Sequence, residues 1–559
     1  MQHDKLTIFF SGMIAADPHQ GGATWAVLQY LLGLKRLGHE VWFVEPIARE
    51  KLRPAGAGGA AKGGLEDSVN ARYFRNVTEA FGLAETSALL VAGSSETAGT
   101  PYERLRGAAK RASVLFNISG MLTDEALLEF IPTRVYLDLD PAFIQLWNAV
   151  SGIDMRFDRH THFVTVGLAI GTPGCDVPTC SRSWIPTFQP IVLQHWPAGG
   201  VGEKIETDAF TTVANWRGYG SITHEGKFYG QKAHSLRQLI DLPAKVAKHG
   251  RGEQGRAVMP ALNIHPAEVN DLALLAEHGW KYLDAADVAG TPEKYARFIR
   301  GSRGELGIAK SGYVVSRCGW FSDRSACYLA SGRPVVAQET GFSAFLPCGE
   351  GLLAFSTSDE AAAGIEAVCS DPARHARAAR TLAVELFDSD KVLGRLLERV
   401  VPEAKGANPF VGTARRVPVT RGSVRAKGSD PFPPAAPSKA HPSHVTTRAL
   451  RNVLGKACEG PGGAGMAQGG QKILSIHRRF SDYSTSFALE ELSVEFPGNR
   501  RVDLMFKNLS TDALLHGARQ TRPAMIYDPR REILVYQHIL ASAGLGTARC
   551  HAAVGDVRR

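Results

Sequence analysis

Near the amino terminus, an apolar run, a glycine pair and an amphipathic pattern follow one another, and this order most constrains the fold. Leu6–Phe10 is continuously apolar, a loop with Gly21 and Gly22 comes next, and apolar residues then recur at helical spacing as far as Gly38. Val41–Val44 is the next apolar run. The order predicts a βαβ unit with parallel strands, in which the glycine loop lies at the carboxyl end of the first strand.

The same alternation continues for about 400 residues and predicts an α/β fold built from two halves. We place the halves at residues 1–205 and 206–401, and we expect a helix to close the second. The further strands we expect are Ala88–Ala92, Ser113–Ile118, Arg134–Leu139, Thr211–Asn215, Val258–Ile264, Gly312–Val315 and Pro334–Ala337.

The composition changes beyond residue 401. Residues 402–470 are rich in Pro, Gly, Ala and Arg and poor in aliphatic side chains, so they cannot bury enough apolar surface to offset their ordering entropy. We therefore predict a disordered basic linker there. Residues 471–559 regain strand-like and helix-like patterns and are expected to form a small α+β segment.

Charge and cysteine content limit the classes of function. The net charge is +9, but residues 401–559 hold 23 basic and 12 acidic residues, so the first 400 are close to neutral. This predicts no nucleic-acid partner for the α/β body. The 8 cysteines show no disulfide or zinc-ligand spacing, which favours a reducing, cytoplasmic setting and no metal site. We find no apolar run of membrane-spanning length, and we interpret Leu6–Ala16 as a strand rather than a signal sequence.

The loop after the first strand is the first candidate site. Gly21 and Gly22 would let backbone amides approach a phosphate at the start of a helix, although they could equally form only a tight turn. His19, in the same loop, is placed to act as a general base, against the alternative of an idle solvated histidine.

Two carboxylates at the end of a later strand form the second candidate. Strand alternation would put Asp138 and Asp140 on one face, just before Pro141 ends the strand. They could orient a histidine, bind a metal or cap the next helix. We favour orientation of His19 by Asp138, and capping stays the alternative for Asp140.

The third candidate is a pair of loops expected at one edge of the second sheet. A serine or aspartate caps a helix whose amides and arginine could receive an anion, and the following strand leads to a glycine loop at the same edge. An ordinary helix cap is the alternative. The residues proposed to bind a donor here are Ser322, Asp323, Arg324, Glu339, Thr340 and Gly341.

Two segments of the first 400 residues resemble the GT-B glycosyltransferases. They are GGATWAVLQYLLGLKRLGHEVWFVEP, with its "L…GHEV" pattern, and SDRSACYLASGRPVVAQETGFSAFLPCGEGLLAF, which is similar to the donor-binding segment. The resemblance implies two Rossmann-like halves, the first holding an acceptor and the second a nucleotide sugar. It also implies a histidine base with an orienting aspartate in inverting members, which His19 and Asp138 match by position.

The pattern departs from the family in two places. The E-x7-E pattern of retaining members is absent, since Ala330 stands seven positions after Asp323, and the plant-type donor motif is absent too. The sugar and the stereochemistry therefore cannot be carried over.

The tail resembles a different family. RRFSDYSTSFALEELSVEF, VDLMFKNLS and DPRREILVYQHILASAGLGTA are similar to the N-lobe of aminoglycoside-phosphotransferase-like kinases. The resemblance implies that Lys507 contacts ATP phosphates and pairs with Glu532. The catalytic loop and the metal-binding aspartate of that family are missing, so we expect no kinase activity. A docking module for a protein partner, a fusion remnant or an unrelated small module stays open.

These observations predict a glycosyltransferase that needs no cofactor beyond its nucleotide-sugar substrate and acts on an unidentified acceptor. Arg217, Lys232 and the helix at Ser322 would hold the leaving diphosphate without a metal. A nucleotide-sugar epimerase and a non-catalytic scaffold that binds nucleotide sugars are the alternatives.

Overall fold

The computed structural model divides the chain into two units, Met1–Lys405 and Gly406–Arg559, and we describe each by itself. The structure describes residues 5–54, 64–199, 205–248, 257–401, 473–480, 489–498 and 500–507. The predicted linker at 402–470 and Glu532 lie outside these ranges.

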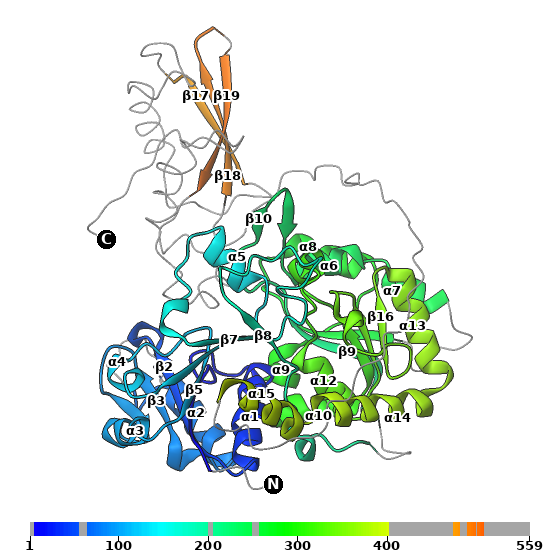
Figure 1. The fold of residues 1–559 in the computed structure, drawn as a ribbon. Helices are drawn as coiled ribbons and strands as arrows, with labels where there is room; N and C mark the ends of the chain where they lie inside the picture. Colours follow the sequence, from blue (N-terminus) through cyan, green and yellow to red (C-terminus); the bar gives the residue numbers. More distant parts are fainter. Residues whose placement is uncertain are drawn as a thin grey trace. The chain divides into compact units, whose positions relative to one another are not determined.

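The first sheet has the order β4-β3-β2-β1-β5-β6-β7-β8, and every neighbouring pair is parallel except β3 and β4 (Figure 1). Its strands read as continuous apolar runs because both faces of the sheet are covered. Ile8 and Phe10 point into one hydrophobic cluster, whereas Phe9 points into another. The strands are β1 (Thr7–Ser11), β2 (Glu40–Ile47), β3 (Ser87–Val91), β4 (Thr97–Gly99), β5 (Val114–Ile118), β6 (Thr133–Asp138), β7 (His162–Thr165) and β8 (Trp184–Pro186).

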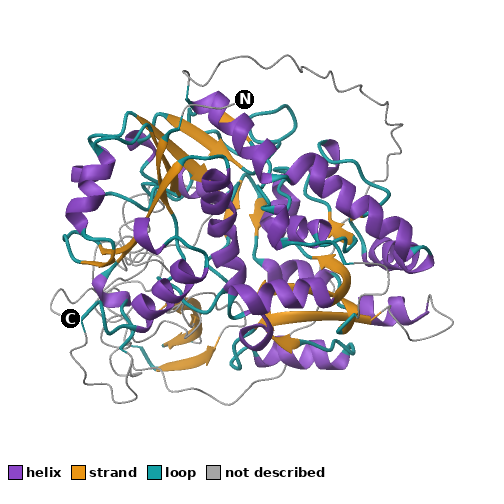
Figure 2. Ribbon diagram, turned by 90° about the horizontal axis from the view of Figure 1, so that it is seen from below, coloured by secondary structure: helices purple, strands orange, loops and turns teal. Residues whose placement is uncertain are grey.

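Helices pack on both faces of this sheet (Figure 2). The α-helices of the first half are α1 (Gly21–Arg36), α2 (Val69–Ala80), α3 (Tyr102–Ala109), α4 (Glu125–Leu128) and α5 (Phe143–Ala149). Short 3-10 turns lie at Arg49–Lys51, Ala84–Thr86, Phe157–Arg159 and Leu193–His195.

The second sheet is parallel throughout, with the order β13-β12-β9-β14-β15-β16. Its strands are β9 (Thr207–Asn215), β12 (Ala257–Asn263), β13 (Leu283–Asp284), β14 (Ser302–Gly307), β15 (Val335–Gln338) and β16 (Leu352–Phe355), and a separate hairpin joins β10 (Ile222–His224) to β11 (Lys227–Tyr229). The helices are α6 (Lys232–Gln238), α7 (Leu242–Lys248), α8 (Val269–Glu277), α9 (Ala285–Ala289), α10 (Pro292–Gly301), α11 (Ser311–Ser316), α12 (Asp323–Ala330), α13 (Ser358–Ser370), α14 (Pro372–Leu382) and α15 (Ser389–Val400), with a 3-10 turn at Phe342–Ala344 and a π-helical turn at Ala383–Phe387.

Helix α1 joins the two halves, because α10 and α15 of the second half pack against it (Figure 1). The Trp25 indole donates to the carbonyl of Pro292 at 2.8 Å, and the amide of Ser389 donates to the carbonyl of Ile191 at 2.9 Å. The closing helix thus returns to the first half. The α/β class with two halves, each built on a mainly parallel sheet, is predicted from the sequence and confirmed by the structure.

One predicted strand of the second half is wrong. Gly312–Val315 belongs to helix α11, and the neighbouring strand of the sheet is β14. A four-residue apolar run does not distinguish a strand from a buried helical turn. The true strand was missed because its sequence, SRGELG, holds a charged residue, Glu305, which is completely buried against Arg324.

The second unit contains an antiparallel sheet in the order β17-β18-β19. Its strands are β17 (Ser475–Phe480), β18 (Leu489–Phe496) and β19 (Arg500–Lys507). Lys507, the last residue of β19, lies opposite Leu489 in the strand register. Because Glu532 is outside the described residues, the kinase-like pair stays a prediction.

Candidate functional site

A buried carboxylate fixes the loop between β1 and α1. Glu45 on β2 is completely buried and accepts hydrogen bonds from the amides of Ile14, Ala15 and Ala16, at 2.6–2.9 Å. Burial raises the pKa of Glu45 to about 7, although these three amides favour its charged form. The loop that carries His19 is therefore held by β2.

Gly21 and Gly22 lie where the two halves pack closely together. A Cβ atom on Gly21 would lie 2.3 Å from the carbonyl oxygen of Thr291, and one on Gly22 would lie 2.9 Å from the ring of Tyr295. The second half therefore leaves no room for a side chain at these two positions, and donor binding by their backbone amides stays a prediction.

His19 lies at the edge of this loop with an exposed side chain and a φ of +68°. Its ring packs edge-on against Tyr73, with the centroids 5.1 Å apart. Strand β5 stands between β1 and β6 in the sheet, so two strand spacings, about 10 Å, separate the strand that leads to His19 from the one that ends at Asp138. No hydrogen bond joins these two residues in the described part of the chain.

The Asp138 carboxylate instead forms all of its hydrogen bonds within the first half. It is completely buried and accepts hydrogen bonds from Gln145 Nε2 and Thr165 Oγ1, each at 2.8 Å, and from the amide of Asp140 at 2.9 Å. Burial raises its pKa to about 7. These contacts join the ends of β6 and β7 to α5, so they explain the carboxylate without a histidine partner.

Asp140 reaches across to the second half. Lys310 Nζ lies 3.0 Å from both of its carboxylate oxygens, and the hydroxyls of Tyr219 and Tyr313 also donate to it. Strand β6 ends at Asp138, so the alternation of side chains along a strand no longer fixes the direction of Asp140. The two carboxylates therefore point to different surroundings.

Lys310 is the functional candidate that the sequence reasoning missed. Its ammonium group lies 4.2 Å from the ring centroid of Tyr219 and 5.2 Å from those of Phe143 and Tyr313, within cation–π range. Burial lowers its pKa, against the opposing effect of Asp140. Recognising β14 would have placed this lysine at the carboxyl edge of the second sheet.

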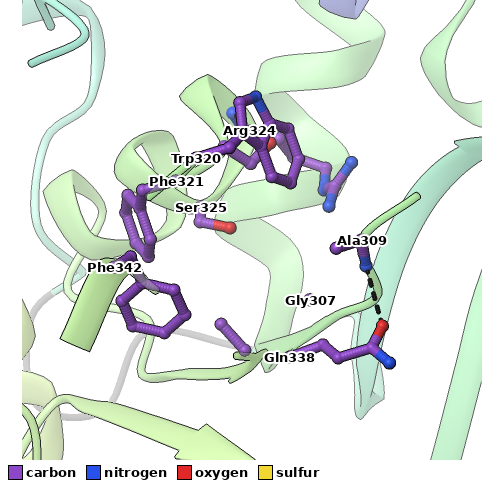
Figure 3. Close-up of a pocket in the computed structure, with 10 residues that line it drawn as sticks. Gly307, Ala309, Trp320, Phe321, Arg324, Ser325, Gln338 and Phe342 are labelled. Atoms are coloured by element: carbon purple, nitrogen blue, oxygen red, sulfur yellow. Dashed lines mark hydrogen bonds between the residues drawn. The ribbon is translucent and has the colours of Figure 1, made fainter. Parts of the chain in front are cut away.

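The amino end of α12 lies beside a small pocket at the same edge (Figure 3). Ser322 caps the helix, its hydroxyl accepting from the amide of Arg324 at 3.2 Å. The rings of Phe321 and Phe342 stand on one side, and on the other Ala309 donates its amide to Gln338 at 3.2 Å (Figure 3). The partial positive charge of the helix end therefore faces the pocket.

Arg324 does not offer a free cation to this pocket. Its guanidinium forms a buried ion pair with Glu305 and donates to the carbonyl of Val213 at 2.9 Å, so it ties α12 to β14 and β9. Asp323 begins the helix, and burial raises the pKa of its carboxyl group. Ser322 and Arg324 are thus brought to the predicted place, but the arginine charge is neutralised.

Arg217 and Lys232, both predicted to hold the diphosphate, differ in whether they have ionic partners. Arg217 pairs with Glu268, with Nε 2.6 Å from the carboxylate, and also contacts Asp271. Lys232, at the start of α6, has no hydrogen bond or ion pair among the residues that the structure describes. Its pKa is lowered well below the ordinary value by burial and by the nearby charges of Arg324 and Lys310.

The loop after β15 mostly supports the turn before α12. Thr340 donates its hydroxyl to the carbonyl of Trp320, and the Glu339 carboxylate accepts from the amide of Gly341. A Cβ atom on Gly341 would lie 2.6 Å from the carbonyl oxygen of Arg317. The chain packing explains Thr340 and Gly341, and donor binding by Glu339 stays a prediction.

The described residues contain neither a cluster of metal ligands nor a helix able to span a membrane. None of their His, Cys, Asp and Glu side chains gather in threes as metal ligands would. None of the helices there combines the length and apolar character needed to cross a membrane.

Comparisons with known proteins found likeness only among solved structures. No protein-family model matches the chain, and neither does any curated protein sequence. An alpha-glucosyltransferase in complex with UDP-glucose and DNA containing an abasic site is similar at 13% identity and a TM-score of 0.43, over 70% of this chain and 98% of that one. HepE of Anabaena in complex with UDP and glucose is similar at 12% identity and a TM-score of 0.42, over 71% of this chain and 100% of that one.

Proposed function

We propose that the chain is a glycosyltransferase that moves a sugar from a nucleotide-diphosphate donor to an acceptor hydroxyl between the two α/β halves. The observation that carries the proposal is Lys232, a half-buried lysine that has no hydrogen bond or ion pair among the described residues. Removing an ammonium group from water without a direct ionic partner is costly, so an anion bound beside it would be favourable. In open α/β sheets such a ligand binds at the carboxyl edge, where β14 and β15 end.

The leaving diphosphate would gain its charge compensation from the protein. Lys232, Lys310 and the amino end of α12 supply positive charge at this edge of the second sheet. Fixed positive charge of this kind stabilises negative charge that develops on a leaving group. Arg324 supports the arrangement by holding α12 on β14.

We assign the proton acceptor to Asp140 in preference to His19. Asp140 shares Lys310 with the proposed diphosphate site, so a donor that draws the lysine away would leave the carboxylate with the Tyr219 and Tyr313 hydroxyls but without its cation. His19, the base expected from sequence, lacks the orienting contact with Asp138. Transfer would join the acceptor oxygen to the sugar, break the bond to the diphosphate, and pass the hydroxyl proton to Asp140.

The test is a thermal-shift panel on the full chain with hexose diphosphates of uridine, guanosine, cytidine, thymidine and adenosine. We expect at least one donor to raise Tm in proportion to its concentration, and the corresponding monophosphate to have little effect. The Lys232→Met variant should lose the shift. Lys245→Met is the matched control, since Lys245 pairs with Asp241 and Asp359 on the surface. No shift with any donor, or equal shifts with monophosphates, would contradict the proposal.

A further inference from the structure

Beside the candidate site, a groove with apolar walls and a cationic rim runs between the two halves and α15. Its cavity volume is about 280 Å³, and it opens to solvent. The residues that line it include Leu168, Phe188, Phe345, Leu396, Arg395 and Arg399.

We propose that this groove binds a single-chain anionic amphiphile, an alkyl chain that ends in a phosphate or carboxylate. The alkyl chain requires an apolar surface, and the aliphatic and aromatic side chains of both halves that line the groove provide it. Phe345 remains 40% exposed although it is a large apolar residue. A ligand chain covering it would remove that surface from water, which is favourable at about 25 cal/mol per Å².

The anionic head group requires positive charge, and two arginines at the rim of the groove provide it. Arg395 and Arg399 are four positions apart on α15, so they lie on one face of the helix. Their hydrogen bonds go to backbone carbonyls: Arg395 Nε to Lys391 at 3.1 Å and Arg399 Nη1 to Pro186 at 3.2 Å. Neither guanidinium has a carboxylate within ion-pair distance in the described ranges, and a guanidinium fork matches phosphate and carboxylate geometry.

Charge also decides against the chain's own following segment as the occupant. Residues 402–470 hold ten Lys and Arg residues against three Asp and Glu residues. A segment with that excess of positive charge would be repelled by the two arginines, whereas an anionic head group is attracted to them.

The groove and the pocket beside α12 share chain segments. Gly167, next to Leu168 in the groove wall, forms a β-bridge with Trp320, which lines the pocket. Phe342 lines the pocket, and Phe345 follows three residues later in the groove. A ligand in the groove would therefore lie beside the proposed transfer site, but its binding does not depend on that proposal.

The test measures binding of monomeric dodecyl phosphate and dodecanoate to the full chain by isothermal titration calorimetry. We expect both to bind, and dodecyl maltoside, dodecyltrimethylammonium and inorganic phosphate to bind at least tenfold more weakly. The variant R395Q/R399Q should weaken dodecyl phosphate binding at least tenfold with an unchanged Tm. R377Q/K391Q, which removes two exposed cations outside the groove, should not.

A second variant tests the apolar wall. Phe345→Ser, at an exposed position, should weaken both dodecyl phosphate and dodecyl maltoside while R395Q/R399Q weakens only the anion. The proposal is overturned if the full chain binds neither anion, if the cationic and anionic amphiphiles bind equally, or if R395Q/R399Q has no effect. Binding to phosphatidylglycerol vesicles without binding to the monomeric amphiphiles would also overturn it.

Discussion

The two sheet edges that meet at the candidate site differ in whether their polar side chains find partners within their own half. In the first half, Glu45 and Asp138 are completely buried and accept hydrogen bonds from neighbouring amides and side chains. In the second half, Lys232 has no partner in the part of the chain that the structure describes, and Lys310 takes its partner from the other half. The difference teaches that the polar groups of the first half hold its own loops, whereas the second half leaves a lysine unpaired, as the proposed anion site requires.

Asp138 and Asp140 show the same contrast at closer range. The first is locked between β6, β7 and α5, and the second faces Lys310 across the halves. Two residues of sequence separate a structural carboxylate from a candidate catalytic one, because the strand ends between them.

The largest expected effect concerns catalysis at Asp140. Asp140→Asn should lower turnover by about two to four orders of magnitude, the usual contribution of a general base. Diphosphate affinity should not fall, since Lys310 loses a competing partner. His19→Gln is the matched variant, and we expect its turnover to stay within a few-fold of wild type. Steady-state kinetics with the donor found in the thermal-shift panel decides between them, and the reverse ranking would return the role to His19.

The next effect concerns stability in the second half. Arg324→Met should destabilise the protein by about 3–5 kcal/mol, because it leaves the Glu305 carboxylate buried without its partner. Arg303→Met is the control, since the Arg303–Asp208 pair lies nearer the surface and should contribute about 1 kcal/mol or less. Urea unfolding measures both, and similar losses would show that burial does not distinguish these pairs.

A smaller effect concerns the contact between the halves. Gly21→Ala should cost about 1–3 kcal/mol, because the new Cβ would overlap the backbone of Thr291 and Ala289. Gly107→Ala, in α3 with no atom near its Cβ, should instead stabilise by about 0.5–1 kcal/mol. Thermal unfolding compares them, and an unchanged Tm for Gly21→Ala would mean that the halves separate readily.

The last effect is a change in pH dependence. The pKa of Asp138 is raised from 3.8 to about 7, so between these values the folded state keeps a proton that the unfolded state has lost. Stability from this group is therefore present at low pH and is lost as pH rises through 7. Asp138→Asn should flatten the fall in unfolding free energy between pH 4 and 7. An unchanged slope would show that the carboxylate titrates normally.

The sequence predicted the architecture better than the site. Continuous apolar runs such as Leu6–Phe10 identify strands buried on both faces, and the helices between them follow from their spacing. Strand β14 was not predicted because it contains the charged residue Glu305, whose partner Arg324 lies 19 positions away in the sequence. The pairing of Lys310 with Asp140 spans 170 positions, and no local pattern specifies such a contact.

The role of the glycine pair could not be predicted for a related reason. A turn, a phosphate site and a close approach of two backbones all favour glycine. The position of Thr291, which the second half supplies, shows that a close approach of two backbones requires glycine at position 21.

The most direct test of the central claim is proton uptake when a nucleoside diphosphate binds. Because Lys232 has a strongly lowered pKa without a ligand, a bound diphosphate should raise that pKa and draw a proton from the buffer. Calorimetric titrations at a series of pH values below the ordinary lysine pKa, in buffers of different ionisation enthalpy, measure this uptake. We predict net uptake in the wild type, none in Lys232→Met, and at least tenfold weaker binding in that variant. Binding without proton uptake and with the same affinity in both proteins would contradict the claim.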